Sequence, residues 1–118
     1  MASLSDTLRA FQERANDNTR VKTLIRSWKR KIVVKSDTSS EVFTMRVEQG
    51  RIADVATGDH GDDESIMLSA REEIILAVFS GAKNPAREYT DGRLTVLGDE
   101  SDKMKLDAIC FVLWGDVP

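Results

Sequence analysis

The fold of this chain is decided by residues 79–98, which read FSGAKNPAREYTDGRLTVLG. Gly81 follows an apolar helical pattern and predicts the end of that helix, because a residue free to adopt positive φ commonly follows a helix. The pair Asn84-Pro85 predicts the start of another, since Asn caps helices and Pro fits the first helical position. An Asp-Gly turn then leads into residues 93–97, which alternate as a half-buried strand does.

This stretch leads into an apolar helix, which we predict over residues 100–114. Gly98 and Asp99 end the preceding strand and cap the helix. Seven consecutive apolar residues, 108–114, leave the helix almost no polar face at its C-terminal end. We therefore expect the rest of the protein to cover it.

Two helices and three strands are predicted at the beginning of the chain. Ser3 caps a helix over residues 4–15. Residues 16–19 interrupt that helix and cap a second one, whose apolar stripe at helical spacing runs from Val21 to Trp28. The strands are predicted at residues 31–35, 42–48 and 51–55.

The third of these strands does not alternate cleanly. Ile52 and Val55 cannot lie on the same face without a β-bulge, so the pattern predicts one there. A polar loop follows at residues 58–64, and the short apolar run 66–68 indicates a buried strand. The spacing from Ser69 to Glu72 is that of a capping box, which predicts a helix start at this point.

Together these elements predict one α+β domain over residues 1–118. It contains five strands, the first three of them consecutive and antiparallel, and its helices lie on one face of the sheet. The exposed face carries polar side chains such as Lys31, Arg46 and Arg93. A sheet that is apolar on one side and polar on the other fits helices packed on one side only.

Composition excludes several classes of protein. A net charge of −3 argues against nucleic-acid binding, for which a basic domain is expected. One cysteine permits no internal disulfide, and no apolar run reaches the length of a membrane-spanning helix, so we expect no stable membrane insertion. The chain also lacks a secretory signal pattern, and it ends in residues 115–118, which do not form the peroxisomal Ser-Lys-Leu signal. We therefore expect a cytoplasmic protein.

The order of these parts resembles the sterol carrier protein-2 (SCP2) family of small lipid-binding domains, over roughly residues 9–114. The resemblance rests on the order and spacing of short motifs rather than on one diagnostic motif. These are the acidic loop, short strand and helix start at residues 62–69, Gly81, Asn84-Pro85, the strand over residues 89–96 with its Asp91-Gly92 turn, and Gly98-Asp99 before an apolar helix. The resemblance implies a five-stranded mixed sheet and no catalytic activity.

Members of the SCP2 family hold an acyl chain or a sterol in an apolar tunnel between the sheet and the last helix. The resemblance implies that this protein binds a small hydrophobic ligand for lipid transfer and needs no cofactor. The residues that line the tunnel can be assigned by their positions in the sequence. The strands would contribute Phe43, Met45, Leu94 and Val96, and the last helix would contribute Met104, Ala108, Phe111 and Val112. Further contributors implied in the same way are Phe11, Ile25, Trp28, Ile74 and Val78.

The residues themselves leave two explanations of this interior open. Methionines and aromatic residues can line an adaptable pocket, but they also fill ordinary cores, which pack without voids. The second explanation makes the chain a structural or protein-interaction domain with a solid core. Trp114 would then anchor a homodimer or a contact within a larger assembly, and it could equally contact a ligand.

Reactive groups do not form a catalytic or metal-binding pattern in this sequence. His60 lies among acidic residues, but the spacing fits neither an EF-hand loop nor a zinc site, so we predict a solvated acidic loop. Cys110 lies within the apolar run and is predicted to be a buried, inert thiol. The nucleophile-elbow, dinucleotide-binding and P-loop motifs are absent, and we predict no enzyme activity.

Overall fold

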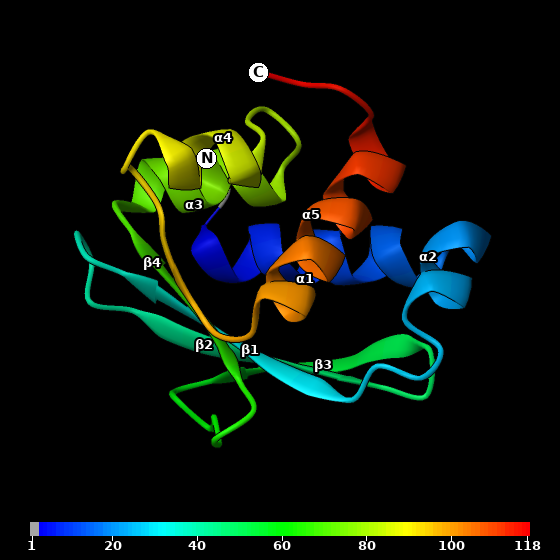
Figure 1. The fold of residues 1–118 in the computed structure, drawn as a ribbon. Coiled ribbons are helices and arrows are strands. Elements are labelled where there is room, and N and C mark those ends of the chain that lie inside the picture. The colour runs from blue at the N-terminus through cyan, green and yellow to red at the C-terminus, as the bar shows by residue number, and fades with distance from the viewer. Residues whose placement is uncertain (1–2) are drawn as a thin grey trace.

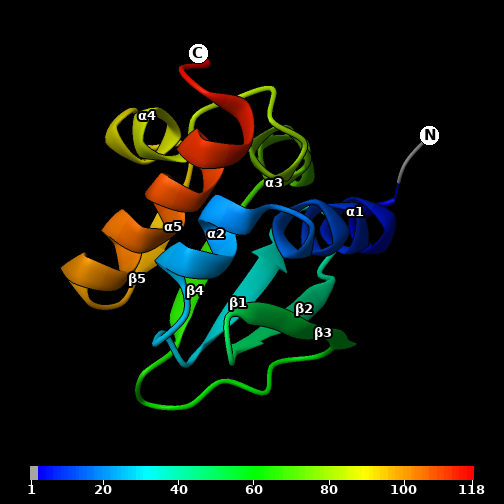
Figure 2. The same ribbon diagram turned by 90° about the vertical axis from the view of Figure 1, so that its right-hand side faces the viewer.

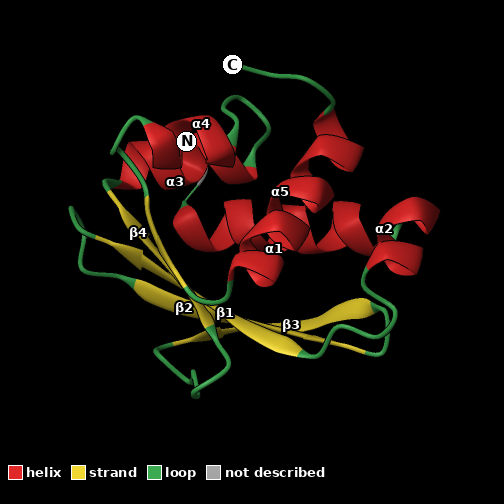
Figure 3. Cartoon of the chain, viewed as in Figure 1, coloured by secondary structure: helices red, strands yellow, loops and turns green. Residues whose placement is uncertain are grey.

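A computed structural model describes residues 3–118 as a single sheet with all of its helices on one face (Figure 1). Colouring by secondary structure makes the two layers clear, with strands below and helices above (Figure 3). The helices are α1 (Leu4–Asn16), α2 (Thr19–Leu24), α3 (Glu72–Phe79), α4 (Pro85–Thr90) and α5 (Glu100–Trp114). The strands are β1 (Arg30–Ser36), β2 (Val42–Glu48), β3 (Arg51–Thr57), β4 (Ile66–Ala70) and β5 (Thr95–Leu97).

The sheet is mixed, with the strand order β3-β2-β1-β4-β5. Strands β1, β2 and β3 form an antiparallel meander, β4 runs parallel to β1, and β5 runs antiparallel to β4. The turned view places α1 above the meander and α5 nearer to β4 and β5 (Figure 2). The predicted α+β class, the five-stranded mixed sheet and the one-sided helical layer are confirmed.

The irregularity predicted for β3 is a β-bulge. Arg46 pairs with Asp54 and the next residue, Val47, pairs with Ile52, so β3 contains one extra residue between the two pairs. Because of this insertion, Ile52 and Val55 are both buried in the core.

The acidic loop between β3 and β4 crosses the face of the sheet that carries no helices, where it lies below the strands in Figure 1. The Asp59 carboxylate lies 3.5 Å from Nζ of Lys35, and Asp62 lies 3.9 Å from Nζ of Lys31. Between these lysines, Val33 is only 1% exposed, and a Cβ on Gly61 would lie 3.0 Å from its Cγ2 atom. The carboxylates of the loop are exposed to solvent, as predicted. The loop also shields Val33 of β1 from water.

Two predicted helix boundaries are wrong. Ser69 does not cap α3, because it lies within β4, where it pairs with Lys35 and Thr95. The first free N–H of α3, on Glu72, instead donates to Oγ1 of Thr38 at 2.8 Å, from the turn between β1 and β2. Helix α2 ends at Leu24, so Trp28 lies beyond it.

Helix α5 is less completely covered than its sequence predicts. Its inward residues Leu106, Ile109 and Cys110 are buried. On its outer side, however, Met104 is 71% exposed and Phe111 is 56% exposed. Helices α2 and α4 flank α5 but contain six residues each, so they leave part of its apolar surface open.

Candidate functional site

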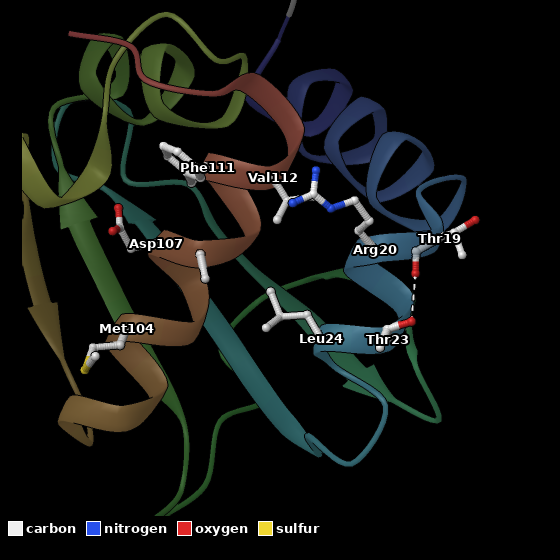
Figure 4. A pocket seen from close by; sticks show the side chains of 9 residues that line it. Thr19, Arg20, Thr23, Leu24, Met104, Asp107, Phe111 and Val112 are labelled. Carbon is white, nitrogen blue, oxygen red and sulfur yellow. Dashed lines mark hydrogen bonds between the residues drawn. The ribbon is translucent and has the colours of Figure 1, made fainter.

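An apolar groove of about 640 Å³ lies between α2 and α5 (Figure 4). Ligand-binding sites for small molecules commonly have volumes in this range and a mainly apolar lining. Its lining residues are Thr19, Arg20, Thr23, Leu24, Met104, Asp107, Ala108, Phe111 and Val112.

The apolar walls of the groove come from both helices. Leu24 on α2 points toward α5, and Val112 on α5 points toward α2 (Figure 4). Leu24 and Val112 also pack against the buried core, so the walls are held in place from behind. Phe111 and Met104 lie on the α5 side and expose most of their surface. A hydrophobic molecule in the groove would cover apolar area that now contacts water.

The α2 side of the groove carries polar side chains, among them Thr23 and Arg20. Thr23 Oγ1 donates to the Thr19 carbonyl oxygen at 3.1 Å, as the dashed line in Figure 4 shows. This bond occupies the hydroxyl proton of Thr23. Arg20 is exposed and lines the groove from α2 (Figure 4). The groove therefore joins an apolar wall to one cationic edge.

Asp107 places a carboxylate beside a buried thiol. Its Oδ1 atom is buried and has no hydrogen-bond partner among residues 3–118. Burial, and to a smaller extent the negative charge of Asp107, raises the pKa of Cys110 to about 12. Cys110 therefore stays protonated near neutral pH, as expected for an inert thiol.

A smaller pocket of about 180 Å³ lies on the other flank of α5, next to α4. It shares Met104 and Asp107 with the groove, so α5 separates two apolar depressions. Val96 of β5 lines this second pocket. At its edge, Lys103 Nζ lies 5.2 Å from the centre of the Tyr89 ring, a cation–π contact.

The structure divides the eight predicted ligand-binding residues between two places. The four predicted on strands, namely Phe43, Met45, Leu94 and Val96, are buried in the core cluster. Leu94, however, precedes β5, which begins at Thr95 and not at residue 93 as predicted. The four on α5, namely Met104, Ala108, Phe111 and Val112, line the groove together. The inward side of α5 therefore separates the strand residues in the core from the α5 residues in the groove. Of the further contributors, Phe11, Ile25, Trp28 and Val78 are in the core and Ile74 packs against it.

Sequence reasoning did not identify the α2 side of the groove. Leu24 belonged to the recognised apolar stripe of this helix and could have been proposed on that signal. Thr19, Arg20 and Thr23 carry no comparable signal, because polar residues on one face of a helix ordinarily face solvent.

Trp114, at the end of α5, is half-buried and packs within the chain. Its ring centre lies 5.8 Å from that of Phe11, and the Arg14 guanidinium lies 5.8 Å above its ring. A Cβ on Gly81 would lie only 2.5 Å from Cγ of Trp114, so the indole rests directly on the backbone after α3.

Residues 3–118 contain no group of three or more His, Cys, Asp or Glu side chains placed to hold a metal ion. His60 Nε2 is hydrogen-bonded to the Thr57 carbonyl oxygen at 2.8 Å within its own loop. Within the same described range, the helices are all too short or too polar to cross a bilayer.

No family model and no curated protein sequence matches this chain. Solved structures do match it. A sterol carrier protein domain 2 of Helicoverpa armigera aligns with a TM-score of 0.69 and 16% identity, over 94% of this chain and 87% of that one. A structure described as a UbiJ-SCP2 ubiquinone synthesis protein aligns with a TM-score of 0.65 and 15% identity, over 86% and 83% of the two chains.

A third match is the palmitated SCP2L2 protein of Aedes aegypti. Its TM-score is 0.64 at 14% identity, over 92% of this chain and 95% of that one. The alignments cover most of both chains and agree with the resemblance found in the sequence. This chain has the fold of the sterol carrier protein-2 domains.

Proposed function

We propose that this protein binds a small hydrophobic ligand, such as a fatty acyl chain or a sterol, and does not transform it chemically. The observation that carries the proposal is the apolar groove between α2 and α5 on an SCP2 fold. One structural neighbour is described as palmitated, which supports an acyl chain as the first ligand to test.

The eight predicted residues have two roles in this proposal. Met104, Ala108, Phe111 and Val112 contact the ligand in the groove, where apolar surface is already accessible. A ligand that reaches further, into a tunnel between the sheet and α5, requires α5 to move outward. Its inner end would then contact Phe43, Met45, Leu94 and Val96, which the packed core now covers.

Two properties of the chain support such an opening. Met45 and Met104 have flexible thioether side chains, which can repack around ligands of different shape. The outer side of α5 also exposes Met104 and Phe111, and the helices α2 and α4 that flank it are short. Affinity would come from burial of apolar area, worth about 25 cal/mol per Å². We therefore expect selectivity by length and bulk rather than by a specific polar group.

The test is a titration of the purified protein with a fluorescent fatty acyl probe, followed by displacement with unlabelled palmitate. Ala108→Trp should fill the groove and weaken binding at least tenfold, and Met104→Trp should act in the same direction. Glu13→Trp adds the same side chain at an exposed position of α1, away from the groove, and should not change the affinity. Circular dichroism would establish that each variant is folded.

The possible results separate the parts of the proposal. Absence of saturable probe binding would contradict ligand binding itself. Binding that neither Ala108→Trp nor Met104→Trp weakens would contradict this location. Recovery of chemically altered ligand after prolonged incubation would contradict the non-catalytic role, which a mass spectrum of the extracted lipid would decide.

A further inference from the structure

The segment from Arg20 to Lys35 is strongly basic in a chain whose net charge is −3. It contains seven Lys or Arg residues and no Asp or Glu. This segment covers most of α2, the turn that follows it and most of β1. Such a local excess of one charge is typical of a surface that binds a partner of opposite charge.

The structure neutralises only part of this segment. Arg30, Lys31 and Lys35 form ion pairs with the acidic loop, at Glu64, Asp62 and Asp59 respectively. Four exposed cations have no carboxylate within 4.0 Å among residues 3–118, and these are Arg20, Lys22, Arg26 and Lys29. The unpaired charge is therefore concentrated on α2 and the turn after it.

Two of these cations border the apolar groove or the depression beside it. Arg20 lines the groove itself, and Arg26 lines an adjoining depression that shares Thr23 and Leu24 with it. Lys105 of α5 lines the same depression, where its Nζ donates to the Leu24 carbonyl oxygen at 3.3 Å. Across the groove lie Phe111 and Met104, which are largely exposed. The single acidic lining residue of the groove is Asp107.

We propose that this surface docks on a lipid bilayer that contains anionic headgroups. Phe111 and Met104 enter the boundary between headgroups and acyl chains, while Arg20 and Arg26, which line the groove and the depression beside it, contact the phosphate groups. Apolar side chains beside unpaired cations are the combination that holds proteins at an anionic membrane surface without spanning it.

Charge selects the bilayer over a second copy of this chain as the occupant. In a two-fold dimer through the groove, the cationic segments of both copies would border one interface and repel each other. The headgroups of an anionic membrane would instead pair with the cations, and the bilayer would cover the apolar residues at the same time. Docking would also turn the groove toward the membrane, but it does not require that the groove hold a ligand.

The experiment is cosedimentation of the protein with vesicles of phosphatidylcholine alone and of phosphatidylcholine mixed with phosphatidylglycerol. We expect binding to the mixed vesicles only, weakening as salt is added. Each neutralised cation should lower the affinity about fivefold, so Arg20→Gln combined with Arg26→Gln should lower it about 25-fold. The matched control, Arg9→Gln combined with Arg71→Gln, removes the same charge from exposed sites outside the groove and should leave most of the affinity.

Phe111→Ser tests the apolar contribution and should also weaken vesicle binding. The proposal is overturned if the protein does not bind phosphatidylglycerol vesicles, or if both pairs of Arg variants weaken binding equally. It is also overturned if light scattering shows a dimer that Phe111→Ser dissociates while vesicle binding stays unchanged. The acyl-probe titration without vesicles tests ligand binding separately, so failure of one proposal is distinguishable from failure of the other.

Discussion

The indole Nε1 of Trp28 donates a 2.7 Å hydrogen bond to Oδ1 of Asp102, which joins the segment before β1 to the first turn of α5. The second carboxylate oxygen of Asp102 accepts from Nε of Arg30 at 3.0 Å. The Asp102 side chain is only 7% exposed, and these two bonds satisfy it inside the protein. The N-terminal end of α5 is therefore fixed to the sheet layer, while the outer side of the helix, at Met104 and Phe111, is open.

Replacing Asp102 by Ala should destabilise the protein by about 3 kcal/mol. The change leaves the indole N–H of Trp28 without its acceptor and removes one partner of a largely buried ion pair. Urea unfolding monitored by circular dichroism measures the loss. Glu100→Ala is the matched control in the same turn of α5, because Glu100 is exposed and its ion pair with Lys103 lies at the surface. Equal effects of the two changes would contradict the anchoring role of Asp102.

Gly81→Ala should be more destabilising than Gly92→Ala. Both glycines have positive φ, +86° and +80°, where a side chain costs about 1–2 kcal/mol. A Cβ on Gly92 meets open space, but one on Gly81 meets the Trp114 ring. Gly81→Ala should therefore also displace Trp114.

Denaturant unfolding gives the two free-energy changes, and tryptophan emission reports the position of the ring. Emission should shift toward that of exposed indole in Gly81→Ala and stay unchanged in Gly92→Ala. If both variants lose the same stability and keep the same emission, Trp114 does not rest on Gly81 in solution.

Cys110 should react very slowly in the folded protein. With a pKa of about 12, roughly one thiol in ten thousand is ionised at pH 8, and the side chain is also buried. Alkylation by iodoacetamide at pH 8 should therefore be slow in buffer and fast in denaturant, as followed by mass spectrometry. Comparable rates in the two conditions would contradict a buried, protonated thiol.

The same pKa shift predicts how stability depends on pH. An unfolded cysteine ionises near pH 8.5, but the folded state retains this proton up to about pH 12. The unfolded state therefore binds fewer protons between these values, and the free energy of unfolding should fall as pH rises above about 8.5. Cys110→Ala should reduce this dependence relative to the unsubstituted protein.

Local patterns were sufficient to predict most of the fold. The alternation of Phe43, Met45 and Val47 identified both β2 and its buried face, and all three residues are in the core. Asn84 caps α4 as predicted, with its side-chain oxygen accepting from the Arg87 N–H at 3.1 Å. These features depend on neighbours in the sequence, which is why the sequence is informative about them.

The failures share a different cause, because each depends on residues far apart in the sequence. Thr38 caps α3 across 34 positions, which no local capping motif can indicate. In α5, the apolar run 108–114 surrounds the helix, so the pattern could not reveal that Ile109 and Cys110 face inward while Phe111 faces outward. The α2 side of the groove exists only through the packing of α2 against α5.

The proposed ligand site is tested most directly by the methyl signals of the methionines in protein labelled with carbon-13 at these groups. Met104 lines the groove, Met45 is in the core, and Met67 alternates with core residues of β4 and so lies on the opposite face of the sheet. Titration with palmitate should shift the Met104 signal in a saturable manner and leave Met67 unchanged. A shift of Met45 in the same titration is expected if the ligand reaches the tunnel beneath α5. If saturating palmitate leaves the Met104 and Met45 signals unchanged, the protein does not bind the acyl chain at α5.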